Sequence, residues 1–167
     1  MPDYDQALAV SSALAVVNCL GQQIKIVGKR VHTQMRTTPL YELLRTVSGI
    51  GPILSQTILL ETGEIKRFSS VGDYASYCRC VNSTKVSNGK RKGQGNVKNG
   101  NPYLSWAYAE AATFAIRLNP RVQRYYQRKQ AKTNVPVARK TVAHKLPRAC
   151  YHMMRHQVPF DETKAFG

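Results

Sequence analysis

The chain has 167 residues, of which 43% are hydrophobic, and it carries a net charge of +16 with a pI near 10.1. This length suits one ordinary domain with an appended element, and the apolar fraction suffices for a core, which excludes a disordered basic tail. The excess of positive charge fits a polyanion better than a small acidic substrate.

The N-terminal segment predicts a long helix from about Asp5 to Met35. Its apolar residues follow a heptad, with one position taken by Val10, Val17, Ile24 and Val31 and the other by Ala13, Leu20 and Val27. β-Branched residues at the first position with Leu at the second favour a two-stranded coiled coil, so we predict that residues 1–38 form a dimerisation helix that builds a homodimer or a higher homo-oligomer. Two alternatives remain: a helix packed on its own domain, and one arm of an intrachain helical hairpin in a longer protein. Gly21 and Gly28 weaken an isolated coil.

The same segment bears on location. Ala7–Val17 is apolar, but Asp3 and Asp5 stand where a signal peptide requires basic residues. We expect no apolar run long enough to span a bilayer, and no membrane partner. Four cysteines lie scattered among apolar neighbours, as reduced core thiols do: Cys19, Cys78, Cys80 and Cys150. We therefore predict a cytoplasmic protein.

A break at Thr37-Thr38-Pro39 begins a second unit, residues 39–167. Strand signals are nearly absent from it, and helical periodicity punctuated by Pro and Gly predicts an all-α domain. The predicted helices are Leu40–Val47, Ile53–Glu61, Ser70–Cys80, Pro102–Leu118, Pro120–Ala131 and Pro136 to about His156. Ser70 and Asp73 have the spacing of a capping box, and Asn119 has the place of an N-cap.

The segment Val47–Ser55 has the form of a helix-hairpin-helix. Gly49 and Gly51 permit a tight turn, and Pro52 fits the first position of the next helix. The N–H groups at the start of that helix can hold a phosphate without regard to base sequence. The same turn also serves simply to pack two helices, and no basic residue lies inside it.

The segment 82–101 is predicted to be a long basic loop, and loops of this length are usually functional or disordered. Ser87 is followed by the turn-forming pair Asn88-Gly89, and Ser83 lies nearby. The cations around them are Lys85, Lys90, Arg91, Lys92 and Lys98. A serine that attacks DNA must be exposed and surrounded by cations that stabilise the transition state, and Ser87 meets these conditions. On composition alone, a mere phosphate contact is the simpler interpretation.

Positive charge is concentrated from this loop onward. Between Asp73 and Asp161, Glu110 is the single acidic residue among 17 Lys and Arg. Two predicted helices carry cations on one face, namely Arg121, Arg124, Arg128 and Lys132 on the first and Lys140, Lys145 and Arg148 on the second. Each phosphate that such a surface neutralises releases counterions, so nucleic acid is the expected partner.

Other chemistry finds less support. The nine acids are scattered, so we expect neither a two-metal site nor any cofactor in this chain. A zinc site of Cys78, Cys80, Cys150 and His152 has the wrong spacing. Tyr125 and Tyr126, beside arginines, are candidates for nucleic-acid contact and rival nucleophiles, whereas Trp106, Tyr103 and Tyr108 are expected in the core.

These motifs together carry a resemblance. Val47–Pro52, Phe68–Tyr77, Ser87-Asn88-Gly89 and Asn99-Gly100-Asn101 before an Ala-rich helix resemble the C-terminal transposase domain of the insertion-sequence transposases known as bridge-RNA-guided serine recombinases. The resemblance covers about Leu40 to the end, and the first helix is similar to part of that family's coiled coil. The family motif commonly has Ser-Gly where this chain has Ser87-Asn88-Gly89, which leaves Ser83 as a lesser candidate.

The resemblance implies that Ser87 attacks DNA to form a phosphoserine link, and that this chain lacks a family domain with four carboxylates. That domain would hold Mg²⁺, a guide RNA would direct the complete protein, and the protein would work at the prokaryotic nucleoid. An alternative is a non-catalytic module that binds junctions or structured RNA. A third, weaker alternative is a ribosome-associated or chromatin-like basic protein.

Overall fold

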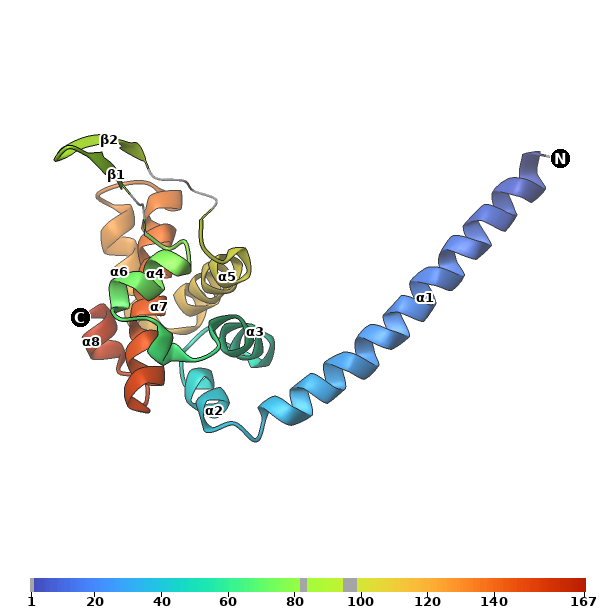
Figure 1. Ribbon diagram of the computed structural model, residues 1–167, viewed down its shortest axis with the longest axis horizontal. Coiled ribbons are helices and arrows are strands. Elements are labelled where there is room, and N and C mark those ends of the chain that lie inside the picture. Colours follow the sequence, from blue (N-terminus) through green and yellow to red (C-terminus); the bar gives the residue numbers. More distant parts are fainter. Residues whose placement is uncertain (1, 82–83, 95–98) are drawn as a thin grey trace. The chain divides into compact units, whose positions relative to one another are not determined.

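The computed structural model describes residues 2–81, 84–94 and 99–167, and the chain divides into two compact units that meet at Thr37 and Thr38 (Figure 1). The first unit is a single helix, α1 (Pro2–Met35), of 34 residues. Its heptad side chains are solvent-exposed, with Leu20, Ile24 and Val27 each more than half exposed. The long predicted helix is therefore present, and its apolar residues share faces of a single helix.

The composition of α1 corrects one expectation. The stretch Asp3–Met35 is long and apolar enough to cross a bilayer by those two criteria alone. No charged residue occurs from position 6 to position 24, and the polar interruptions there are uncharged Ser, Asn and Gln. The expectation considered only unbroken apolar runs. Uncharged polar residues interrupt such a run, but they leave the mean hydropathy of the whole stretch high. Coiled-coil and core helices have the same length and composition.

The second unit confirms the all-α class. Its helices are α2 (Pro39–Arg45), α3 (Pro52–Thr62), α4 (Val71–Tyr77), α5 (Pro102–Leu118), α6 (Pro120–Gln130), α7 (Val135–His156) and α8 (Glu162–Phe166), with a 3-10 turn at Ile65–Arg67. Helix α7 is the central element, since α2, α4, α5, α6 and α8 all pack against it. Leu104, Tyr108, Leu146 and Cys150 are fully buried there. The 3-10 turn and α8 were not predicted.

The segment expected to be a loop contains a β-hairpin. Strands β1 (Thr84–Ser87) and β2 (Lys90–Gln94) pair antiparallel, with Ser87 opposite Lys90 and an irregularity between Thr84 and Val86. Such a strand pair is polar and isolated from any larger sheet, so the alternation that normally marks strands is missing. The Asn88-Gly89 pair was the available signal, because it favours two-residue hairpin turns.

Buried polar groups in the core are matched with one another. The hydroxyl of Tyr74 lies 2.9 Å from that of Thr62 and 2.8 Å from that of Tyr108, and all three residues are fully buried. Burial raises the pKa of the Tyr74 and Tyr108 phenols well above their usual range. This chain of neutral hydroxyls joins α3, α4 and α5 without leaving an unsatisfied oxygen in the core.

Asparagine caps start the long helices. Asn119 Oδ1 accepts hydrogen bonds from the N–H groups of Arg121 and Val122, which confirms the predicted cap of α6. Its Nδ2 donates to Glu162 Oε2 at 2.7 Å and to Ser48 Oγ at 3.1 Å. The predicted capping box of Ser70 and Asp73 is also present at α4. One side chain, Asn119, thus ties the α2–α3 turn, α6 and α8 together.

Replacing Asn119 by alanine is expected to lower the free energy of unfolding by about 2 kcal/mol, because it removes a cap and leaves the partly buried Ser48 and Glu162 side chains without this partner. Asn134→Ala is the matched control, since Asn134 caps α7 through Val137 N and is exposed. The control is expected to lose only about 1 kcal/mol. Urea unfolding of the two variants measures both values, and equal losses would contradict the tying role of the Asn119 amide.

Candidate nucleic-acid interface

The predicted serine lies at the tip of the β-hairpin. Ser87 ends β1, and Asn88 and Gly89 take positive φ angles of 52° and 70°, so the predicted tight turn is present. Ser87, Asn88, Gly89 and Lys90 are all exposed. Among the described residues no hydrogen bond joins the Ser87 hydroxyl to an acid or a base. The serine is therefore accessible, and no described group is in place to take its proton.

Several predicted residues of this segment are outside what the structure describes. Ser83 and Lys98 lie in the stretches 82–83 and 95–98. The side chains of Lys85, Arg91 and Lys92 are likewise outside the described set, although their backbone belongs to the strands. Lys90, opposite Ser87, is the one predicted cation of the hairpin whose exposed side chain is described.

The chain on either side of the segment 80–99 is fastened to the helical domain. Arg79 donates from Nε and Nη2 to the Gly100 carbonyl at 3.2 and 3.0 Å, and Asn101 N donates to Tyr77 O at 2.7 Å. Gly100 has a φ of 95°, and a Cβ there would lie 2.5 Å from the Tyr77 carbonyl oxygen. Only glycine fits this close approach, so the returning chain is fixed where α5 begins.

A polar cluster stands beside this anchor. Asn101 Oδ1 caps α5, and its Nδ2 donates to Glu61 Oε2 at 2.6 Å and lies 3.4 Å from the Tyr77 hydroxyl. The Arg67 guanidinium lies over the rings of Phe68 and Tyr77 at 4.5 and 4.6 Å. Hydrogen bonds from Asn101 and Arg67 lower the pKa of the Tyr77 phenol. The cluster joins α3, α4 and α5 at the place where the hairpin leaves the domain.

The α2–α3 turn shows what its glycines do. Gly49 has a φ of 94° and sits against the backbone of α5, where a Cβ would meet the Ala111 carbonyl oxygen and lie 2.6 Å from Ala115 N. Gly51 caps α3 with ordinary extended backbone, and Pro52 occupies the first turn as predicted. Gly49 is thus required for packing, whereas phosphate binding by this turn stays a prediction.

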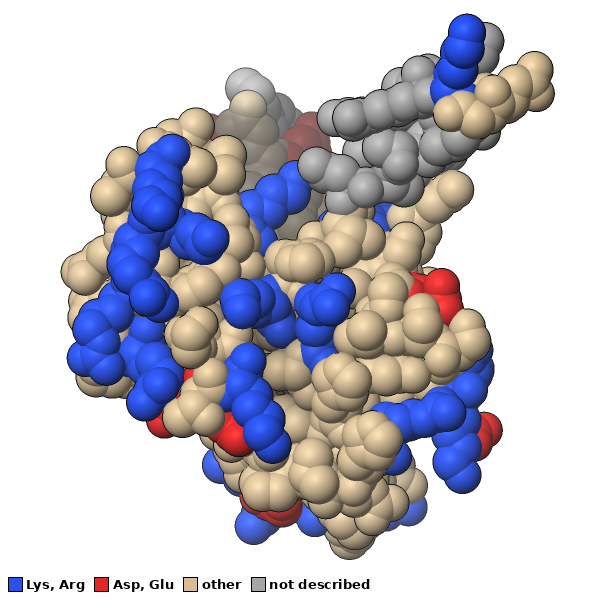
Figure 2. Space-filling model, turned by 90° about the vertical axis from the view of Figure 1, so that its left-hand side faces the viewer, with Lys and Arg blue, Asp and Glu red and all other residues tan. Residues whose placement is uncertain are grey.

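Two neighbouring helices carry the predicted basic faces. Figure 2 shows Lys and Arg gathered over this side of the molecule, with few acidic groups between them. Helices α6 and α7 pack side by side, and the predicted cations that are exposed are Arg124 and Arg128 on α6, Lys132 just after it, and Lys140 and Arg148 on α7. Arg121 is half-buried. The side chains of most hairpin cations lie outside the described residues, so a surface that joins these helical faces to the hairpin stays a prediction.

Lys145 is engaged within the fold. Its Nζ donates to the Ala165 carbonyl at 2.7 Å and lies 5.1 Å from the centre of the Tyr125 ring. Burial, together with the neighbouring charges of Lys129 and Arg148, lowers the pKa of Lys145. The Lys145 ammonium holds α8 against α7. It is therefore less available to a ligand than its position on the predicted basic face indicates.

Aromatic residues depart from the predictions. Tyr125, expected at the nucleic-acid surface, is buried against Phe166 with ring centres 5.4 Å apart, whereas Tyr126 is only partly buried. Trp106 and Tyr103, expected in the core, are 49% and 62% exposed, although Tyr108 is buried as predicted. Tyr103, Trp106 and Phe114 face solvent because the alanines of α5 face the neighbouring helices.

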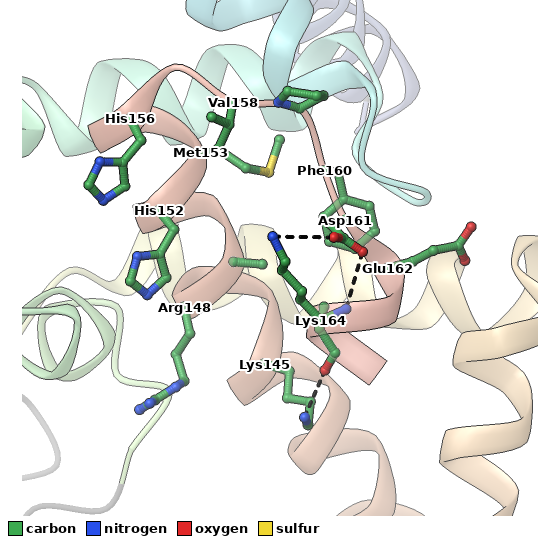
Figure 3. Close-up of a pocket in the computed structure, with 13 residues that line it drawn as sticks. Lys145, Arg148, His152, Met153, His156, Val158, Phe160, Asp161, Glu162 and Lys164 are labelled. Carbon is green, nitrogen blue, oxygen red and sulfur yellow. Dashed lines mark hydrogen bonds and ion pairs between the residues drawn. The ribbon is translucent and has the colours of Figure 1, made fainter. Parts of the chain in front are cut away.

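A cationic pocket of about 950 Å³ lies between the end of α7 and the segment 158–165 (Figure 3). Arg148, His152 and His156 line the α7 side, and the two imidazole rings are nearly parallel with centres 6.0 Å apart. On the other side Asp161 caps α8 and pairs with Lys164 at 3.6 Å. The sequence analysis did not predict α8, which forms this second side of the pocket, because α8 is only five residues long and gives too weak a periodic signal.

The cysteines behave as core thiols where they are enclosed. Cys78 and Cys150 are buried, and burial raises the pKa of Cys150 to about 12 and that of Cys80 to about 12. In the part of the chain that the structure describes, no cluster of three or more His, Cys, Asp or Glu side chains has the arrangement of a metal site. Burial thus disfavours the thiolate form of Cys80 and Cys150.

Comparison with known proteins adds to this geometry. Residues 41–127 match the family described as "Transposase IS116/IS110/IS902 family". A curated relative, "Insertion element IS110 uncharacterized 43.6 kDa protein" of Streptomyces coelicolor, is 22% identical over 125 residues. The match covers 75% of this chain and 31% of that relative, so the chain spans well under half of the length of the protein it matches.

Proposed function

Because the chain belongs to the transposase IS116/IS110/IS902 family, we propose that its second unit binds DNA and supplies a serine nucleophile for strand exchange in the transposition of an insertion sequence. The observation that carries the proposal is the position of Ser87. It lies at the exposed tip of a hairpin whose turn is formed by Asn88-Gly89, and Arg79 and Gly100, which flank the segment that carries the hairpin, are hydrogen-bonded to each other. A nucleophile for a long strand needs this access.

The proposed reaction is a pair of transesterifications. Ser87 Oγ loses its proton and bonds to a DNA phosphorus, while the bond from that phosphorus to a deoxyribose oxygen breaks and the leaving oxygen takes a proton. A hydroxyl of a second strand then attacks the phosphoserine, and the Ser87 oxygen leaves and is reprotonated. One P–O bond forms and one breaks in each step, so no ATP is needed.

This chain supports parts of that chemistry. Lys90, directly across the strand pair from Ser87, is placed to stabilise negative charge on the phosphate. No described base lies at hydrogen-bond distance from Ser87, so the proton acceptor must come from elsewhere. We propose that a carboxylate domain of the complete protein supplies it and holds Mg²⁺. A guide RNA would select the DNA in the prokaryotic cell, and copies of the protein would associate through α1.

The test of this proposal is to trap the covalent intermediate. A complete transposase that carries this domain is incubated with a DNA substrate that has a nick opposite the cleavage site, so that the released strand diffuses away. We expect a denaturation-resistant protein–DNA adduct, and mass spectrometry is expected to place the nucleotide on Ser87. An adduct on Ser83 or on Tyr126, or no adduct alongside efficient strand transfer, would overturn the serine assignment.

A second candidate function is a non-catalytic nucleic-acid-binding module. The missing base at Ser87 and the exposed cations of α6 and α7 favour it. This module would hold phosphates along the two helices and ignore base sequence, as phosphate contacts do. It predicts retained biological activity when Ser87 is replaced, which separates it from the first proposal.

Both candidates share one prediction about α6. Replacing Arg124 and Arg128 together by glutamine is expected to weaken binding to every DNA sequence alike and to reduce the slope of log K against log salt by about 2. Both side chains are exposed, so the fold should survive. Lys25→Gln in α1, with Lys29→Gln, is the charge-matched control. Fluorescence anisotropy with two unrelated duplexes, measured from low to high salt, checks the result, and an unchanged slope would exclude α6 from the interface.

A further inference from the structure

The pocket between α7 and α8 plays no part in the serine chemistry proposed above. It lies wholly within the second unit and has a volume of about 950 Å³, at the upper end of the range of about 300–1,000 Å³ that is usual for small-molecule and cofactor sites. Arg148, His152 and His156 line it at intervals of four residues, and Figure 3 shows them along one face of α7. These three residues are called the α7 row. The pocket has room for a ligand larger than a single ion.

The two carboxylates of the pocket have partners on the opposite wall. Asp161 Oδ1 accepts hydrogen bonds from the backbone N–H groups of Thr163 and Lys164, and Oδ2 lies 3.6 Å from Lys164 Nζ. Hydrogen bonds, first of all from the Thr163 hydroxyl, lower the pKa of the Asp161 carboxyl. Glu162 Oε2 accepts a hydrogen bond from Asn119 Nδ2 at 2.7 Å. Within the described residues, neither acid forms an ion pair with the α7 row.

Arg148 has no counter-charge among the described residues. Its side chain is exposed, and in the part of the chain that the structure describes no hydrogen bond or ion pair engages it. Its charge acts on its neighbours instead. Burial first, and then Arg148, lowers the pKa of His144, and burial together with Lys129 and Arg148 lowers the pKa of Lys145. A carboxylate bound to the guanidinium would offset this effect. The positive potential at the α7 row is therefore left for a ligand to neutralise.

The two imidazoles extend the same row. His152 and His156 are exposed, their rings are within 9° of parallel with centres 6.0 Å apart, and no hydrogen bond among the described residues ties either ring. Each ring offers one N–H donor when neutral and two when protonated, and the guanidinium offers five. Successive positions of the row lie about 6 Å apart along the helix axis. Two members of the row can therefore donate to the oxygens of one phosphate, an anion that arginine-centred donor groups commonly recognise.

Most of the remaining lining is apolar. Met153 is buried on the α7 side, and Val158, Pro159 and Phe160 belong to the other wall, where Val158 is 45% exposed and Phe160 packs against the core. The flat face of a nucleobase covers such a surface, but in a duplex that face is stacked on its neighbours. An acidic peptide would use the cations and leave the apolar wall in water. Free donors beside an apolar wall thus fit a nucleotide whose base is unpaired and unstacked.

We propose that this pocket binds one unpaired nucleotide, with its phosphate at the α7 row and its base against Val158 and Phe160. A free nucleoside monophosphate and the single-stranded end of a DNA strand present the same chemistry, so both are tested. The proposal rests on the nucleic-acid binding proposed above, and it requires neither Ser87 nor the cations of α6.

The first test compares two DNA duplexes of equal length, one blunt and one with a short single-stranded end. We expect the full chain to bind the second duplex about tenfold more tightly, because it adds a charge-assisted phosphate contact and a base contact. Arg148→Gln is expected to remove most of this preference. Arg155→Gln removes the same charge from an exposed position of α7 outside the pocket and is expected to keep it. Fluorescence anisotropy at one salt concentration measures the affinities, and a preference that survives Arg148→Gln, or equal affinity for both duplexes, would overturn the proposal.

The apolar wall has a matched control of its own. Val158→Ser is expected to reduce the preference for the single-stranded end about threefold, because the base loses apolar contact, and to leave binding of the blunt duplex unchanged. Val137→Ser alters the same side chain at nearly the same exposure, 46% against 45%, near the start of α7, and is expected to have no effect. Circular dichroism checks that both variants are folded. Equal effects of the two substitutions would refute the base contact.

A crosslink locates the base directly. A 4-thiothymine at the end of the single strand is irradiated in the complex, and mass spectrometry is expected to find the adduct within residues 158–160 or on Met153. Adducts confined to other segments would place the base elsewhere and refute the proposal.

Calorimetry separates the two sources of the nucleotide. Binding of dAMP that Arg148→Gln abolishes would show that the pocket takes free nucleotides, and a preference for the single-stranded end without dAMP binding would show that it takes strand ends; either result supports the proposal. Binding of a glutamate-rich peptide, with neither dAMP binding nor a preference between duplexes, would show a site for acidic peptides and overturn it. Salt-sensitive binding of the blunt duplex without any preference would refute the pocket alone. Failure of both duplexes to bind would refute the nucleic-acid interface, and the binding of dAMP would then decide the pocket by itself.

Discussion

Replacing Ser87 by alanine in a complete transposase that carries this domain is expected to reduce strand transfer by roughly 10³-fold or more, because the nucleophile is removed and water cannot conserve the phosphodiester bond. DNA binding is expected to persist, since the hairpin backbone does not depend on the hydroxyl. A strand-transfer assay alongside an electrophoretic mobility assay separates the two effects. The substitution is conservative for the fold, because Ser87 is exposed and makes no described side-chain hydrogen bond.

The matched control is Ser83→Ala, which alters the lesser candidate in the same segment. We expect it to retain strand transfer within about twofold, as exposed substitutions away from the chemistry usually do. If Ser83→Ala is inactive and Ser87→Ala is active, the nucleophile is Ser83. If both variants are active, neither serine is the nucleophile, and the trapped adduct then distinguishes Tyr126 from a non-catalytic module.

Replacing Gly49 by alanine is expected to be the most damaging small substitution in the second unit, with a loss of about 3 kcal/mol in the free energy of unfolding. The left-handed backbone at a φ of 94° costs a Cβ about 1–2 kcal/mol. The new methyl group would also lie 2.6 Å from Ala115 N, and overpacking of this kind costs about 1–3 kcal/mol. Guanidinium unfolding followed by circular dichroism measures the loss.

Gly51→Ala is the control, two residues away in the same turn. Gly51 has a φ of −86°, and a Cβ there would have no neighbour within 4 Å. We expect a change within about 0.5 kcal/mol, because alanine fits the backbone while glycine is only modestly favoured as an N-cap. Similar losses for both variants would show that the close approach of Gly49 to α5 does not determine the stability of the turn.

The helices were predictable because their start signals are local. Pro52 stands in the first turn of α3, and Asn119 and Ser70 cap α6 and α4, as their sequences indicate. Each of these signals acts through one or two backbone groups in its own turn. The turn at the hairpin tip was predictable for the same reason, since the pair Asn88-Gly89 favours it locally.

The errors concern which face of a helix is buried. In α5 the hydrophobic rings of Trp106 and Phe114 point outward, while Ala107, Ala111 and Ala115 are fully buried. Hydrophobicity alone predicts the reverse, but small residues are needed where the Gly49 backbone lies against α5. Close backbone approach is a tertiary property, so it has no signature in the sequence of either segment alone. The same applies to Tyr125, which α8 covers.

Only separate parts of the candidate site could be predicted from the sequence. The sequence placed a serine beside a turn and cations on two helices, yet the distance between them depends on how the hairpin leaves the domain. Arg79, Tyr77 and Asn101 determine that exit, and their hydrogen bonds join residues about twenty positions apart. Contacts of that range arise from the folded core, which positions α4 and α5, and not from the segment that carries the serine.

The hydrogen bonds from Arg79 to the Gly100 carbonyl allow the segment between them to be exchanged without a change in the helical core. Arg79 and Asn101 make hydrogen bonds at the two ends of this segment. The packing of the helical core therefore does not depend on how many residues lie between them. Doubling such an excursion costs only about 0.6 kcal/mol in closure entropy. Hairpins of other lengths and sequences can therefore be grafted between these two positions, which gives protein engineers a way to vary the reach of this segment on a constant scaffold.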